Sequence, residues 1–165
     1  MTLHDITQLA LLSVEAARTG DAETLRHALD AGAPVDTATP RGDSLLRRAC
    51  CHGHVEAASV LLEHGANPDT RDARGQTALQ AVASKGLVDV AEVLVSAGAH
   101  VNVPADDGRT ALMVAAAFNR VDMVRWLLER GADAGMRDAA GARALDIALG
   151  MGAQDVVALL SPAAS

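Results

Sequence analysis

The sequence predicts an all-α protein built from repeated pairs of short helices. Of its 165 residues, 35 are alanine and 20 are leucine, whereas the chain has one Trp, one Phe and no Tyr. Small and straight-chained apolar residues favour closely packed helices, and strands prefer β-branched and aromatic residues. Glycines also recur at a fixed interval, which is typical of a repeat architecture. Both observations disfavour a β-sandwich with an aromatic core.

Three series of residues share a period of 33 positions. Gly-Ala pairs begin at Gly32, Gly65, Gly98 and Gly131. A second series consists of Gly42, Gly75, Gly108 and Gly141. The third consists of Gly20, Gly53, Gly86, Asn119 and Gly152, and Asn tolerates a left-handed backbone best after Gly. We therefore expect one domain over residues 1–165, with units at about 4–36, 37–69, 70–102, 103–135 and 136–165, the first and last being caps.

One unit, residues 70–102, shows the elements that we expect in each. Residues 72–75 predict a turn, and Thr77 predicts the N-cap of a helix that begins at residue 78 and ends at Gly86. Ser44 and Thr110 stand in the same position one period away. A second helix is expected over about 87–96, followed by a polar connector over 99–109. Neither helix can bury its apolar face alone, so the units must stack.

This pattern resembles the ankyrin repeat. The sequence TALMVAA at 110–116 and the sequence LLERGA at 127–132 carry the resemblance most clearly. LLEHGA at 61–66 and the Gly53-His54 pair also match, and the likeness runs from about residue 8 to residue 160 in five units. The resemblance implies an ankyrin-repeat solenoid of helix-turn-helix units with hairpin-like loops. It also implies a face of first helices and loop tips that binds other proteins.

The chain departs from the ankyrin pattern in two positions of each full unit. The family's Pro at the start of the first helix is replaced by Leu45, Ala78, Ala111 and Ala144. Its His is replaced by Arg47, Gln80, Met113 and Asp146. Because that His helps to link neighbouring loops in many members, we expect a looser stack. The last unit also carries Arg143 where the others have Ser or Thr, as an atypical cap does.

The positions that vary between units predict the binding surface. The candidate protein-binding residues are Arg41, Asp43, Arg47, His52, Arg74, Gln76, Gln80, Lys85, Asp106, Asp107, Arg109, Met113 and Phe118. Phe118 stands where the other units have mostly polar residues, so it either forms a contact or fills a gap beside Asn119. Trp126 stands in a position that is apolar in other units, so we expect it to pack between second helices.

The charges on this surface suggest the chemistry of a partner. Arg41, Arg47, Arg48 and His52 make the second unit basic, whereas Asp106 and Asp107 make the tip of the fourth acidic, with Met113 and Phe118 behind it. We expect a protein partner with an acidic patch facing the second unit and an apolar pocket or ridge facing the fourth. An adaptor, an inhibitor or immunity protein, and an enzyme accessory all fit this expectation.

A cluster of metal-binding residue types supports a different function. Cys50, Cys51, His52 and His54 lie within five residues, so a metal- or redox-responsive sensor is the alternative. However, no second Cys pair exists, and a disulfide between neighbours is strained. Cys50 also occupies the interior position of Ala83 and Ala116, while His54 occupies the family's own His position. We therefore expect structural roles and no bound metal.

Several classes of protein are disfavoured. The chain has no phosphate-binding loop and no G-x-S-x-G turn, and the paired carboxylates Asp106 and Asp107 fall at an expected loop tip, so we expect no enzyme and no cofactor. The net charge is −7 and the basic residues are scattered, which argues against nucleic acid. No apolar run reaches the roughly 18 residues of a membrane span.

Location, source and assembly rest on weaker signals. The N-terminus shows no basic stretch followed by an apolar one, so we expect a cytoplasmic protein, with secretion as an effector by an unconventional route left open. The 13 arginines against one lysine, together with the alanine excess, favour a GC-rich and therefore bacterial genome. We expect a monomer.

Overall fold

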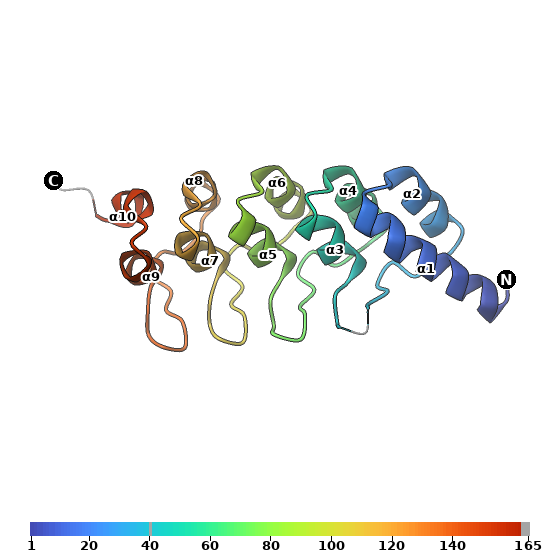
Figure 1. The fold of residues 1–165 in the computed structure, drawn as a ribbon, viewed down its shortest axis with the longest axis horizontal. Coiled ribbons are helices and arrows are strands. Elements are labelled where there is room, and N and C mark those ends of the chain that lie inside the picture. The colour runs from blue at the N-terminus through green and yellow to red at the C-terminus, as the bar shows by residue number, and fades with distance from the viewer. Residues whose placement is uncertain (40, 163–165) are drawn as a thin grey trace.

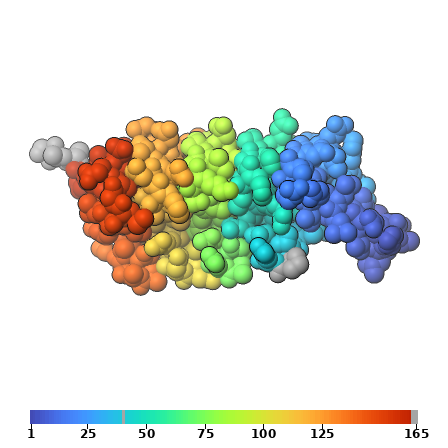
Figure 2. All heavy atoms as spheres, in the orientation of Figure 1, coloured from blue at the N-terminus to red at the C-terminus, as the bar shows by residue number. Residues whose placement is uncertain are grey.

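A computed structural model describes residues 1–39 and 41–162, and these form ten α-helices and one isolated antiparallel bridge between Ala38 and Ser44. The helices lie in two rows, the odd-numbered helices in one and the even-numbered helices in the other, and the connecting loops project from one side (Figure 1). The body is elongated, and the N-terminal helix projects beyond it at one end (Figure 2). The prediction of an all-α repeat solenoid is confirmed.

Each pair consists of a first helix and a second helix that returns antiparallel to it, and from α3 onward a loop precedes each first helix (Figure 1). The first helices are α1 (Leu3–Thr19), α3 (Leu45–Cys51), α5 (Ala78–Lys85), α7 (Ala111–Ala117) and α9 (Ala144–Met151). The second helices are α2 (Ala22–Asp30), α4 (Val55–Glu63), α6 (Val88–Ser96), α8 (Val121–Glu129) and α10 (Gln154–Leu160). The two helices expected within residues 70–102 thus form as predicted.

The helix ends follow the local sequence. The side chains of Ser44, Thr77 and Thr110 each accept a hydrogen bond from the backbone N–H three residues on, which confirms them as N-caps. Gly86 closes α5 with φ 71°, and Asn119 takes φ 53° at the equivalent position. Arg143 is the N-cap residue of α9 but has no side-chain acceptor for the helix N–H groups. Instead, the Asp146 carboxylate accepts a hydrogen bond from the Arg143 backbone N–H at 2.9 Å.

The core is made of alanines and leucines that repeat from pair to pair. Leu61, Leu94 and Leu127 are fully buried in successive second helices. Small residues of the first helices let the neighbouring pair approach closely. The prediction for Trp126 is confirmed, because it is 9% exposed, donates to Glu92 at 2.9 Å and lies under the guanidinium of Arg130.

Polar side chains link neighbouring pairs at two positions where the family's His is replaced. The Gln80 amide donates to the carbonyl oxygens of Val103 at 2.8 Å and Arg109 at 2.7 Å. The Arg47 guanidinium reaches the Asp72 carboxylate at 3.0 Å. Gln80 and Arg47, whose presence in place of the family's His led us to expect a looser stack, therefore link neighbouring units themselves.

We predict that Gln80→Ala lowers the free energy of unfolding by about 1–3 kcal/mol. Gln80 is 2% exposed, and its removal leaves the buried Thr77 N–H and two partly buried carbonyl oxygens without this partner. Urea unfolding followed by far-UV circular dichroism measures the change. Gln76→Ala is the matched control, because Gln76 is partly exposed and its loss is expected to change stability by less than about 0.5 kcal/mol. Equal losses in both variants would contradict this role for Gln80.

The contact between His64 and Asp30 predicts a pH-dependent contribution to stability. The ring Nε2 lies 2.9 Å from the Asp30 carboxylate, and the hydrogen bond to Asp30 raises the pKa of His64 and lowers the pKa of Asp30. The pair therefore stabilises the fold fully below the usual His pKa of 6.5, and the contribution is lost as pH rises through the raised value. It is lost again as pH falls through the lowered pKa of Asp30.

Urea unfolding of wild type and His64→Ala at about pH 5 and about pH 9 checks this expectation. The difference between the two proteins should be larger at the lower pH. In an Asp30→Asn background, the effect of His64→Ala on stability should depend less on pH, because the carboxylate that favours the protonated ring is gone. A difference that does not change with pH would refute the assignment.

Candidate protein-binding surface

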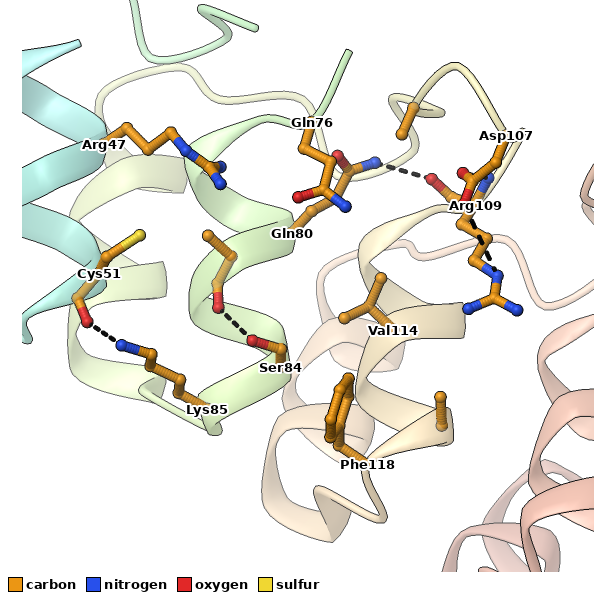
Figure 3. Close-up of a pocket in the computed structure, with 13 residues that line it drawn as sticks. Arg47, Cys51, Gln76, Gln80, Ser84, Lys85, Asp107, Arg109, Val114 and Phe118 are labelled. Atoms are coloured by element: carbon orange, nitrogen blue, oxygen red, sulfur yellow. Dashed lines mark hydrogen bonds and ion pairs between the residues drawn. The ribbon is translucent and has the colours of Figure 1, made fainter. Parts of the chain in front are cut away.

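A shallow groove of about 330 Å³ crosses the first helices α3, α5 and α7 and the loops that precede them (Figure 3). Its apolar lining comes from Ala81, Ala105, Val114, Ala117 and Phe118. Seven of the residues predicted for the binding surface also line it, namely Arg47, Gln76, Gln80, Lys85, Asp107, Arg109 and Phe118. The repeat places these residues together, because each comes from the first helix or the loop tip of consecutive units.

Phe118 is the most exposed apolar side chain of the groove, with 58% of its surface accessible. It follows the last residue of α7, and the left-handed Asn119 turns the chain immediately after it. Because more than half of the ring is exposed, Phe118 does not fill a buried gap, which was the alternative to a contact. The ring projects from the same helix as Val114, on the side of the groove (Figure 3).

Lys85 and Arg109 line the groove, and a third cation, Arg120, contacts the lining residue Ser84. Lys85 is exposed and donates to the carbonyl oxygen of Cys51 across to α3 (Figure 3). The Arg109 guanidinium is 3.9 Å from the Asp107 carboxylate and 3.8 Å from that of Asp138, so its pairing is weak. Arg120 donates from Nε to the Ser84 carbonyl oxygen at 2.9 Å.

Arg120 is not among the residues that the sequence predicted for the binding surface. A signal was available, because the equivalent positions carry His54, Leu87 and Ala153, so a guanidinium there is unusual within the chain. The predicted residues lie on first helices and loop tips, whereas Arg120 is the N-cap residue of the second helix α8. Its long side chain reaches back to α5, a contact that only the packing of adjacent pairs creates.

The Arg47 side chain is less exposed than the sequence predicts. Its side chain is 16% exposed and forms ion pairs with Asp43 at 3.1 Å and Asp72 at 3.0 Å. Two carboxylates therefore neutralise its charge, so it does not present a free cation to a partner. The basic character of the second unit depends instead on Arg41, which is exposed, and on Arg48, which is half-buried.

The prediction that Gln80 and Met113 lie on the surface is wrong. Gln80 is 2% exposed because its amide reaches into the following loop, and Met113 is 1% exposed because this apolar side chain packs into the core. Both occupy the position of the family's His, which faces the next unit rather than solvent. The remaining predicted residues are exposed or partly exposed: Arg41, Asp43, His52, Arg74, Gln76, Lys85, Asp106, Asp107, Arg109 and Phe118.

The Cys-His cluster does not converge on a common point. Cys50 is fully buried as predicted, and burial raises the pKa of its thiol to about 12. The His52 and His54 rings stack with centroids 5.8 Å apart, but Nδ1 of His52 lies 2.8 Å from the Arg48 carbonyl oxygen and Nε2 of His54 lies 3.0 Å from that of Arg18. Among the described residues, no three His, Cys, Asp or Glu side chains are grouped to hold a metal ion.

Comparison with known families identifies the repeat. Residues 13–105 match the family model described as "Ankyrin repeats (3 copies)", and residues 94–148 match the one described as "Ankyrin repeats (many copies)". The chain belongs to the ankyrin-repeat family. Ankyrin repeats are generally modules for protein–protein interaction, and they are typically noncatalytic. A comparison with curated proteins gives no match.

One further observation concerns membranes. In residues 1–39 and 41–162, each helix falls short of the length or the apolarity that a membrane crossing requires.

The two cysteines should differ in reactivity. Cys51 lines the groove and is partly exposed, whereas Cys50 is buried, and burial raises the pKa of both thiols. Because the thiolate is the nucleophile, we expect iodoacetamide to modify Cys51 first in the folded protein, faster as pH rises. Mass spectrometry of the intact chain measures this, and Cys51→Ser should abolish the fast modification. Modification of both thiols at one rate in the folded protein would contradict the assignment.

Proposed function

We propose that this chain is a noncatalytic module that binds a partner protein through the groove and the adjacent loop tips. The observation that carries the proposal is the exposed ring of Phe118 at the edge of an apolar groove. Single exposed apolar residues are common, but here the ring adjoins Ala81, Val114 and Ala117 in one concave surface. Aromatic side chains in such positions contribute strongly to interface energies.

The charges around the groove favour a partner segment that combines an apolar anchor with carboxylates. Lys85 and Arg109 line the groove, Arg120 contacts the lining residue Ser84, and Asp107 is the carboxylate among the lining residues. The chain as a whole carries a net charge of −7, so the sign of these three cations is opposite to that of the whole chain. Such complementarity increases the rate of association and the specificity more than the affinity. The sequence predicted Arg47 as a cation that faces an acidic patch of the partner. Because Arg47 is paired with Asp43 and Asp72, Lys85 and Arg120 take this role in the proposal.

The proposed binding is compatible with an adaptor, an inhibitor or immunity protein, or an enzyme accessory. All three need a surface that recognises one partner and no reacting groups. The groove holds no pair of carboxylates, since Asp107 stands alone in its lining, and its one thiol has a raised pKa. Neither feature favours acid–base or nucleophilic chemistry.

Capture of partners from a lysate of the source organism on immobilised protein, followed by titration of the purified partner, tests the proposal. Phe118→Ala should weaken binding by about 30-fold, the effect of losing an aromatic residue worth about 2 kcal/mol. Leu11→Ala is the matched control, because Leu11 is 60% exposed but lies on α1, away from the groove. Lys85→Glu should slow association and reduce its dependence on salt.

A partner that binds wild type, Phe118→Ala and Leu11→Ala with equal affinity would place the contact outside the groove. Failure to retain any protein on the wild-type chain would overturn the proposed function itself. Arg47 is unsuitable for this test, because its ion pairs with Asp43 and Asp72 support the fold.

A further inference from the structure

Charge is divided between the two rows of helices. The first helices that form the groove, α3, α5 and α7, carry Arg47, Arg48 and Lys85 and no Asp or Glu. The second helices α2, α4, α6, α8 and α10 together carry nine Asp or Glu residues against Arg26 and Arg125. This excess of carboxylates equals the net charge of −7 of the whole chain. The groove therefore crosses helices that lack carboxylates in a chain that is acidic as a whole.

The cations near the groove differ from those on the second helices in their pairing. Arg26 and Arg125 each form an ion pair with a carboxylate, at 2.9 Å and 3.5 Å. In residues 1–39 and 41–162, no ion pair includes Arg48, Lys85 or Arg120. Each of these three side chains is exposed or partly exposed. Their charges are therefore available to carboxylates of a partner.

Arg48 adds a cation beside the groove. It stands one unit before Ala81 and two units before Val114, and both of those residues line the groove. Its Nε is buried and has no hydrogen-bond partner within the described part of the chain. A partly desolvated guanidinium without a partner is unfavourable, and a carboxylate on its other two nitrogens offsets that cost.

The polar groups on the floor of the groove are already used inside the protein. The Gln80 amide donates to two carbonyl oxygens, and the Ser84 hydroxyl donates to a carbonyl oxygen of its own helix at 2.7 Å. At the ends of α3 and α5, the carbonyl oxygens of Cys51 and Ser84 accept from Lys85 and Arg120. An extended segment on this floor would leave its backbone N–H and C=O groups without partners, whereas an α-helix bonds its own.

The spacing of the units also fits a helix. Lys85 and Phe118 are 33 positions apart and lie at the same ends of α5 and α7 (Figure 3). Helices that pack side by side have axes about 8–10 Å apart. A helix advances about 10 Å in seven residues and returns to nearly the same face, whereas an extended chain returns to one face about every 7 Å. A helix laid across the groove therefore presents one side chain to each unit at intervals of seven residues.

We propose that the groove accepts a single acidic, amphipathic α-helix of the partner. An apolar residue of that helix packs against Phe118 and Val114. Carboxylates at intervals of seven residues face Lys85 and then Arg48 on the two preceding units. This inference rests on the proposed function, and it adds the conformation of the bound segment, the position of its charges and a role for Arg48.

Designed peptides of about 22 residues test this inference, because a helix of that length spans the three units. The first peptide carries one Leu and, seven and fourteen residues later, two Glu on the same helical face, with Ala and Gln elsewhere. In the second peptide both Glu are moved two residues further, which turns them to the opposite face at the same composition and net charge. Fluorescence anisotropy of the labelled peptides should show at least about 10-fold tighter binding of the first.

Charge reversal in the protein checks the assigned cations. Lys85→Glu should weaken binding of the first peptide at least about 10-fold and should favour a version in which its first Glu is Lys. Arg48→Gln should also weaken the first peptide, because it removes the second cation. Arg125→Glu is the matched control, since Arg125 is an exposed cation on the second helix α8, and it should bind as wild type does. Circular dichroism verifies that each variant is folded.

Equal affinity of the wild-type chain for the two peptides, or binding of neither, would overturn the inference. So would equally tight binding of a first peptide that carries prolines in its middle, because it cannot form the helix. A partner that the wild-type chain retains and Phe118→Ala does not would in either case leave the proposed function in place. The two failures are therefore distinguishable.

Discussion

Each helix pair of this protein covers the apolar side of the pair before it, and almost every other feature of the structure depends on that contact. A pair of seven- to nine-residue helices is too small to bury its own apolar face, so the core is completed only when pairs stack. The alanine-rich composition follows from this arrangement. Small side chains bring the helix axes close, and the leucines fill the space that remains.

The same contact decides which polar residues are available for binding. Gln80 and Arg47 stand at positions that face the next unit, and both use their hydrogen-bonding groups on that neighbour. A long polar side chain on a first helix is therefore not a surface residue by default. What remains for a partner is chiefly the ring of Phe118, together with the cations Lys85, Arg109 and Arg120, which are exposed although each also contacts a neighbouring unit.

The groove lies across α3, α5 and α7. Its proposed role follows from a departure from the repeat, namely an aromatic ring where other units have mostly polar residues. In a solenoid the framework positions are nearly invariant between units, so such departures are the most informative residues in the sequence.

The sequence by itself determined the architecture. Three residue series with one period, Ser or Thr at the helix starts, and Asn119 in place of a glycine predict the helices and their limits, because these signals act locally through backbone conformation and capping. It also predicted a buried Cys50, a packed Trp126 and most of the groove, because residues 33 apart occupy equivalent places.

Only the tertiary structure decided how individual side chains are used. It shows that Met113 packs inward, that Gln80 and Arg47 link neighbouring pairs, and that Arg120 contacts the Ser84 carbonyl oxygen from the start of a second helix. It also shows that His52 and His54 turn their ring nitrogens to separate carbonyl oxygens. The physical reason is that the direction of a long side chain depends on contacts with neighbouring units, whereas the period records only its place on the helix.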